Sequence, residues 1–193
     1  MKFLALVLLL VTFSSYAALG DSRYGVQAQL NMSKPNVDGG TGSVDEEYSL
    51  SGGAGVRALW GLNDSGLSLR SGLALRQKQA KFDLGSTDVT LEYLYLSIPL
   101  TLHYMVESQS DTKFGFFGGL GADLLVDDDC DVDGNNNCDY DDGKTFVMPL
   151  IVGFDFMFNN NWGMEAWYEH ALTEVDDDVK LNSFVVGGYY QFE

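Results

Sequence analysis

The last strand-like segment, from Asn182 to Phe192, constrains the fold of this chain more than any other feature. Every second residue from Phe184 onward is apolar, aromatic or glycine, and the series closes on Phe192. The residues between them are partly polar, although Val185 and Tyr189 interrupt that face. A strand with an apolar outer face, a partly polar inner face and a terminal aromatic is typical of the final strand of a transmembrane β-barrel.

The N-terminus has the pattern of a secretory signal peptide. Lys2 precedes an apolar run from Phe3 to Phe13, and the small residues Ser15 and Ala17 then occupy the two recognition positions of a cleavage site. The alternative is a membrane anchor, but this run is too short to cross about 30 Å of hydrocarbon at about 1.5 Å per residue. We therefore expect cleavage after residue 17 and a barrel domain over residues 18–193. No lipobox cysteine stands at the cleavage site, so a lipoprotein is not expected.

The formal net charge of −17 disfavours nucleic acid as a partner, because nucleic-acid binding needs a basic surface. No later segment holds eighteen consecutive apolar residues, so no membrane-spanning helix is expected. Much of the negative charge lies in the segments 38–47 and 127–142. We expect neither of these segments to form a strand, and both to be exposed connections.

Apolar residues recur with a period of two in eight segments, each near the length that a tilted membrane strand requires. They cover residues 24–32, 50–60, 67–78, 90–104, 114–126, 145–158, 162–169 and 182–192. The connections between them are alternately long and short, as in outer-membrane barrels whose two termini are periplasmic. Pro99 and Pro149 fall within these segments and cannot donate to a strand ladder, so we expect a bulge or a shifted strand boundary there.

A soluble lipocalin-like barrel is the main alternative to a membrane barrel. In that fold the polar residues would face outward, whereas here the charged face also carries the glycines, as a crowded interior requires. Aromatic residues at the short-turn end of the segments match an interfacial girdle: Tyr24, Trp60, Tyr104, Phe158, Trp162 and Phe192. The sequence therefore predicts an all-β fold, a closed eight-stranded antiparallel up-and-down barrel over residues 21–192, in the bacterial outer membrane.

Three stretches resemble the OmpA-like outer-membrane β-barrel family. They are residues 92–104 (EYLYLSIPLTLHY), 165–173 (EAWYEHALT) and 188–192 (GYYQF). Two positions depart from the family pattern: Trp167 stands where an arginine is common, and Glu193 follows the terminal aromatic. The resemblance implies an eight-stranded outer-membrane barrel, and it does not imply one particular activity.

Eight charged residues are expected to share the inner face: Arg57, Arg70, Arg76, Lys78, Asp123, Asp155, Glu165 and Glu169. Buried charges must be paired, so a salt-bridge network that fills the lumen is one interpretation. The other is a proton or ion path, that is, a narrow channel. An eight-stranded barrel is only wide enough for side chains, which favours the network and an occluded lumen.

The chain contains only two histidines, His103 and His170. Glu169, His170 and Ser183 suggest a Ser-His-acid hydrolase, and hence an outer-membrane deacylase or acyltransferase, as an alternative function. Neighbours on a strand face opposite ways, however, so Glu169 is expected to point inward and His170 toward lipid. Glu169 then cannot orient His170 as a triad requires. We therefore assign no catalytic residue and expect no enzyme.

The loop 127–144 contains the most specific local motif. The spacing Asp129-x-Asp131-x-Asp133-Gly134 matches the start of an EF-hand-like calcium loop and resembles the calcium-binding repeats of thrombospondin type 3. Position twelve is Tyr140 rather than an acidic residue, and the alternative is a solvated acidic loop. Candidate ligands for calcium, the one cofactor considered, are Asp129, Asp131, Asp133, Asn135, Asp139 and Asp141.

Cys130 and Cys138 are the only cysteines, and both lie in this loop. An oxidising periplasm favours a disulfide between them, whereas free thiols or a metal site are the alternatives.

The sequence thus predicts a small outer-membrane barrel with a structural or surface-interaction role. Its expected partners are outer-membrane lipid and an extracellular ligand or surface that meets the long loops.

Overall fold

The computed structural model describes residues 22–37, 45–62, 66–83, 87–106, 112–132, 144–158, 161–176 and 179–192. The predicted signal peptide lies outside these residues. Within them every regular element is a strand, and no helix is long and apolar enough to cross a membrane.

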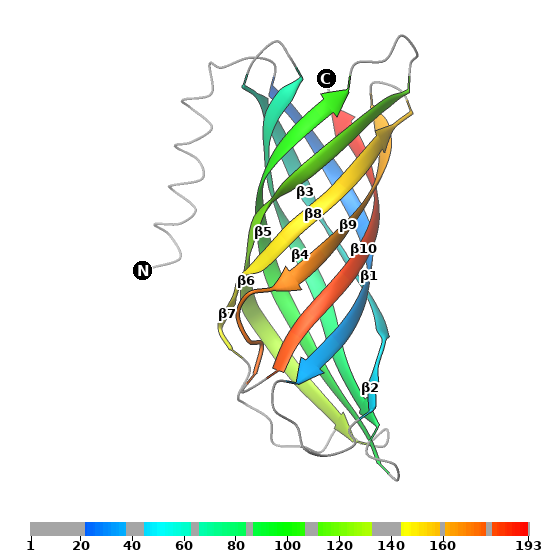
Figure 1. Ribbon diagram of the computed structural model, residues 1–193, viewed down its shortest axis with the longest axis vertical. Helices are drawn as coiled ribbons and strands as arrows, with labels where there is room; N and C mark the ends of the chain where they lie inside the picture. The colour runs from blue at the N-terminus through cyan, green and yellow to red at the C-terminus, as the bar shows by residue number, and fades with distance from the viewer. Residues whose placement is uncertain are drawn as a thin grey trace.

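Eight long strands form a closed antiparallel ring (Figure 1). Each pairs with the next along the chain, the β4–β5 pairing completes the sheet, and β10 pairs with β1. The long strands are β1 (Ser22–Val37), β3 (Ser49–Gly61), β4 (Leu67–Asp83), β5 (Asp88–Val106), β6 (Lys113–Val132), β8 (Pro149–Met157), β9 (Trp162–Ala171) and β10 (Val179–Phe192). Two short strands, β2 (Asp45–Glu47) and β7 (Phe146–Val147), pair with β4 and β6 at the loop end. The predicted meander of eight strands is confirmed.

Side chains alternate between the lumen and the outer surface, as the period of two predicts. On β9 and β10, buried and exposed residues follow one another almost without exception. Tyr24 is 48% exposed and pairs with Phe192, which is 49% exposed, at the short-turn end. Trp162 and Tyr104 also point outward at that end, at 58% and 47%. An aromatic girdle therefore surrounds this end of the barrel.

Several strands are longer than the apolar pattern indicates. The prediction that segments 38–47 and 127–142 hold no strand is wrong, because β2 occupies 45–47 and β6 continues to Val132. The predicted segment 145–158 is divided at Met148 into β7 and β8. Backbone pairing does not need an apolar outer face, so strands continue beyond the membrane, where their outward side chains meet water. An example is Lys81 on β4, which donates to Glu47 of β2 at 2.6 Å. The hydrogen bond and charge of Glu47 raise the pKa of Lys81 above its ordinary value.

A β-bulge in β6 decides which way its acidic end faces. Tyr95 pairs with Leu125 and Leu94 pairs with Asp127, so Val126 is the additional residue. The bulge reverses the alternation of β6. From Asp127 onward every odd-numbered residue points outward, whereas Cys130 points into the barrel.

Neither Pro99 nor Pro149 lies at a bulge, and the other expectation, a shifted strand boundary, is confirmed at Pro149, where β8 begins. Pro99 pairs with Gly121 on β6, and β4 keeps the same register with β5 on both sides of it. The ladder is interrupted only at Gly72 and Leu73, because proline has no N–H. The Ser71 hydroxyl donates to the Pro99 carbonyl at 2.7 Å, so this oxygen keeps a donor where the ladder is interrupted. Pro149 begins β8, where the β6 ladder is similarly interrupted.

Candidate functional site

The lumen contains a first group of ion pairs centred on Glu165 of β9. Arg57 from β3 donates to its carboxylate at 3.1 Å, and Arg70 from β4 donates at 2.9 Å. All three side chains are buried. Period-two alternation on β3, β4 and β9 points them at one another across the barrel axis, so one carboxylate binds two guanidinium groups.

A second group, nearer the loop end, is centred on Glu169. Its carboxylate accepts from Arg76 at 2.6 Å, from Lys78 at 2.9 Å and from the indole N–H of Trp167 at 2.8 Å. Lys78 also donates to Asp123 at 2.7 Å. Trp167, at the position where the family often has arginine, therefore supplies a neutral donor to the same network.

Sequence reasoning missed a third group, which joins His103 to Asp155. His103 Nε2 lies 3.1 Å from one Asp155 oxygen, and the Tyr189 hydroxyl donates to the other at 3.2 Å. Gly115 of β6 lies between them: a Cβ at this position would be 2.8 Å from His103 Nε2 and would also meet the Asp155 carboxylate. The absence of a side chain at Gly115 thus permits this contact across β6.

Aromatic rings flank the lumen cations. The Arg57 guanidinium lies 3.7 Å from the centre of the Tyr189 ring, and Arg70 lies 4.3 Å from that of Phe117. Such contacts add to the ion pairs, because the negative face of a ring attracts a desolvated cation. Val185, which interrupts the polar face of the last strand, packs with Phe117 and Trp167 in a small apolar cluster beside these arginines.

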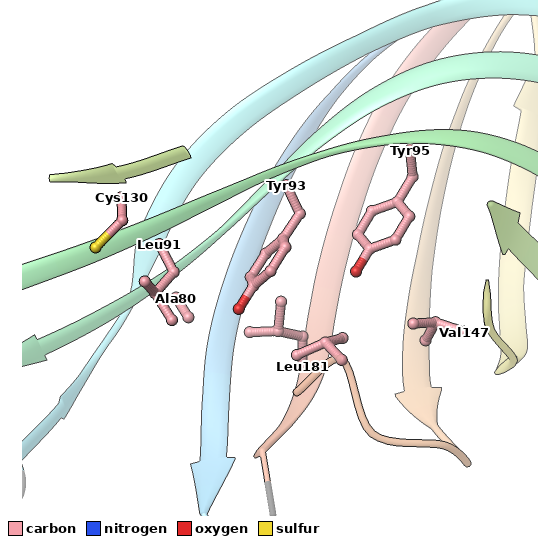
Figure 2. Close-up of a cluster of buried hydrophobic side chains, with 8 residues drawn as sticks. Ala80, Leu91, Tyr93, Tyr95, Cys130, Val147 and Leu181 are labelled. Carbon is pink, nitrogen blue, oxygen red and sulfur yellow. The ribbon is translucent and has the colours of Figure 1, made fainter. Parts of the chain in front are cut away.

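A hydrophobic layer of buried side chains lies in the lumen at the loop end (Figure 2). Tyr93 and Tyr95 extend from β5 toward Leu181 of β10, and their ring centres are 6.0 Å apart. Val175, from the connection between β9 and β10, is only 1% exposed within this layer, and its carbonyl accepts from Lys144 N at 2.8 Å. The remaining buried members are Ala80, Leu91, Cys130 and Val147.

The lumen thus holds paired charges, and buried apolar groups lie beyond them at the loop end. Its four Lys and Arg side chains contact three carboxylates, and the fourth carboxylate, Asp155, is contacted by His103 and Tyr189. The described residues enclose a cavity of about 20 Å³ between Arg70, Thr101 and Trp167, which is room for about one water molecule. All eight residues predicted to share the inner face point into the lumen.

The predicted hydrolase residues do not form a triad. Glu169 is buried in the lumen, whereas His170 is exposed on the outer face, where its Nδ1 lies 3.0 Å from Asn182 Oδ1. Ser183 points into the lumen and shares a hydrogen bond of 3.0 Å with Ser33. The prediction that Glu169 and His170 face opposite ways is confirmed.

The candidate calcium ligands are only partly described. Asp129 and Asp131 lie in the extended end of β6, opposite Glu92 and Thr90, and not in a curled loop. The other candidates, Asp133, Asn135, Asp139 and Asp141, lie outside the described residues, as does Cys138. In the described part of the chain, no three His, Cys, Asp or Glu side chains are arranged to hold a metal ion. The calcium site and the Cys130–Cys138 disulfide therefore remain predictions.

Comparison with known proteins identifies the family. Neisserial surface protein A aligns with 90% of this chain and 100% of its own, at 18% identity and a TM-score of 0.55. The outer membrane protein OprG of Pseudomonas aeruginosa aligns with 91% of this chain and 97% of its own, at 16% identity and a TM-score of 0.53. The outer membrane enzyme PagL aligns with 83% of this chain and 97% of its own, at 12% identity, and its TM-score of 0.46 is too low to support an argument about activity.

No curated protein sequence matches the chain significantly. The sequence matches the family of outer membrane protein β-barrel domains over residues 3–192, which is almost its whole length. The chain therefore belongs to the outer membrane protein β-barrel domain family, and its place is the outer membrane.

Proposed function

We propose that the protein is a non-catalytic, non-conducting barrel that serves the outer membrane as a structural or surface-interaction protein. Its long connections would face outward and its termini the periplasm. The observation that carries this proposal is the lumen, which holds two ion-pair groups followed by a hydrophobic layer.

Conduction is opposed by two different barriers. An ion entering from the short-turn end would have to separate Glu165 from Arg57 and Arg70, which are buried and hydrogen-bonded. An ion entering from the loop end would have to cross Tyr93, Val175 and their apolar neighbours, which cannot hydrate it.

Catalysis on lipid is opposed by the outer face. His170 is the one outward histidine, and its bonded partner is the amide of Asn182 rather than a carboxylate. Ser183, the candidate nucleophile of the predicted triad, is 1% exposed and lies inside the barrel. A base without an acid to orient it and a nucleophile on the opposite side of the wall do not make a hydrolase.

Planar-bilayer recording tests the sealed lumen directly. The folded, full-length protein is expected to give no steady conductance at neutral pH in about 1 M KCl. At this concentration the salt screens the fixed charges of the lumen strongly. A reproducible steady conductance that disappears when a bulkier residue replaces Ala74 beside the cavity would make the protein a channel.

Mass spectrometry of lipid tests catalysis separately. Lipid A and phospholipid incubated with wild-type protein or with His170→Ala are expected to keep all their acyl chains in both samples. Acyl loss with wild type that is absent with His170→Ala would establish the lipid-modifying enzyme instead.

A further inference from the structure

Trp167 stands between the two ion-pair groups of the lumen. The centre of its indole ring lies 5.9 Å from the guanidinium carbon of Arg70 and 5.9 Å from that of Arg76. Arg70 donates to Glu165 in one group, and Arg76 donates to Glu169 in the other. Nε and Nη1 of Arg70 and Nε of Arg76 are buried, and among the described residues they have no hydrogen-bond partner. Each group therefore keeps unused donors beside the ring that separates the two.

Carboxamides on the inner face of β1 form a ladder that reaches the second ion-pair group. Gln27 Nε2 donates to Gln29 Oε1 at 3.5 Å, and Gln29 Nε2 donates to Asn31 Oδ1 at 3.3 Å. The Asn31 oxygen also accepts from Arg76 at 3.4 Å. At the other end of the ladder, Gln27 Oε1 is a buried acceptor without a partner in the described part of the chain. A single link between Gln27 and the unused donors of Arg70 would therefore join the two groups.

The cavity of about 20 Å³ lies where this link would have to form. Gln27 and Arg70 both line it, as do Ser97 and Thr101 on the inner face of β5. The two hydroxyls are buried, and neither has a hydrogen-bond partner within the described ranges. A buried polar group without a partner costs free energy, because it has lost its bonds to water. The cavity thus brings together an unused acceptor, unused guanidinium donors and two unused hydroxyls.

Small or rigid residues keep this polar space open. Pro99 lies between the two hydroxyl residues on β5, and Ala74 of β4 and Gly121 of β6 also line the cavity. A Cβ at Gly121 would lie 2.8 Å from Pro149 Cγ and 3.2 Å from Ile151 Cδ1, so a larger residue there would have to displace β8. The cavity is therefore a consequence of how β4, β5, β6 and β8 pack.

Charge and size select the occupant. Arg70 and Arg76 line the cavity, and so do Asp123 and Glu169, so its lining has no net charge. An anion would meet two carboxylates and a cation would meet two guanidinium groups, so an ion would be desolvated without a compensating charge. A cavity needs about 10–15 Å³ to hold one water molecule. Water is neutral, and it can accept from a guanidinium, donate to an amide oxygen and bond to hydroxyls.

We propose that the cavity binds one ordered water molecule, which joins the two ion-pair groups. The water accepts from Arg70 Nη1, donates to Gln27 Oε1 and bonds to the hydroxyls of Ser97 and Thr101. These are four partners, as many as a buried water uses. The link continues along the β1 carboxamides to Arg76. Ser97 and Thr101 are positioning residues for this water.

A crystal structure of the folded protein, at a resolution that reveals ordered water, tests the proposal. One density peak is expected in the cavity, about 2.7–3.2 Å from Arg70 Nη1 and from Gln27 Oε1. Crystals grown in bromide should show no anomalous signal there, and xenon under pressure should not enter, because xenon binds dry apolar cavities. A bromide signal, bound xenon or the lack of any peak would each overturn the proposal.

The double variant Ser97→Ala/Thr101→Val removes both hydroxyls with little change in shape. It is expected to lower the occupancy of the peak to about half or less, because two of the four partners are lost. If this variant does not fold, Thr101→Val is used alone, with a smaller loss expected. The matched control is Ser71→Ala, which removes a hydroxyl that donates to the Pro99 carbonyl, and it should leave the peak unchanged.

Full occupancy in the Ser97→Ala/Thr101→Val variant, or an equal loss in the Ser71→Ala control, would refute the assigned partners. Conductance and acyl-chain loss are measured separately, so a failure here leaves the proposed function standing.

Discussion

The substitution Gly115→Ala tests whether an empty position on β6 holds the buried His103–Asp155 pair together. The new methyl group would lie 2.8 Å from His103 Nε2 and against the Asp155 carboxylate, so the two side chains must separate. Their 3.1 Å contact would then be lost. A hydrogen bond to a charged group contributes about 1.5–3 kcal/mol, and overpacking a filled site costs about 1–3 kcal/mol, so we expect a loss of about 3 kcal/mol in unfolding free energy.

Urea unfolding in lipid vesicles, followed by tryptophan fluorescence, measures this loss. Gly118→Ala is the matched control on the same strand, because a Cβ there would meet Ile151 O at 3.5 Å and Val152 Cγ1 at 3.8 Å, which are ordinary contacts. The control is expected to change stability by less than about 0.5 kcal/mol. His103→Ser in the Gly115→Ala background should recover part of the loss by making room. Equal stability of the two alanine variants would refute the reasoning.

Three further outcomes are expected. Glu165→Gln leaves Arg57 and Arg70 buried without their carboxylate and should lower the unfolding free energy by about 3–5 kcal/mol, measured by the same urea unfolding. Val175→Asp places a charge in the hydrophobic layer and should increase protease cleavage at the loop end while the barrel stays folded, as judged by circular dichroism. The segment 127–142, in oxidised protein, should bind calcium weakly, with a Kd of about 10⁻⁴–10⁻³ M by calorimetry; absence of heat at millimolar calcium would make it a solvated acidic loop.

The ring of strands and the lumen charges could be predicted because both follow from alternation. In a strand whose alternate residues are apolar and face the lipid, the residues between them must face the lumen. Arg57, Arg70 and Glu165 could therefore be assigned to the lumen before their partners were known. The same argument placed Glu169 and His170 on opposite sides. Alternation involves only residues that are close in sequence, so it can be recognised from the sequence alone.

The pairing of particular lumen groups could not be predicted, since it depends on contacts across several strands. His103 and Asp155 belong to β5 and β8, and they meet only because Gly115 of the intervening β6 carries no side chain. A search for inward polar residues flanking an inward glycine on a neighbouring strand could have suggested the pair. The bulge at Val126 could not be predicted from the sequence either. Consecutive aspartates follow it, so the residue types do not show which of them point outward.

The missed strand ends and the hydrophobic layer in the lumen have one physical cause, a reversal of polarity at the edge of the lipid. Within the membrane β4 is apolar outside and charged inside, with Leu75 exposed and Arg76 buried. Above the membrane the same strand is polar outside and apolar inside, with Gln79 bonded to Glu92 on the surface and Ala80 fully buried. The strand and its period of two are continuous, while the preferred side for apolar groups changes because the outer medium changes from lipid to water. Apolar side chains, whose exposure to water costs free energy, then collect inside the barrel mouth and form the hydrophobic layer.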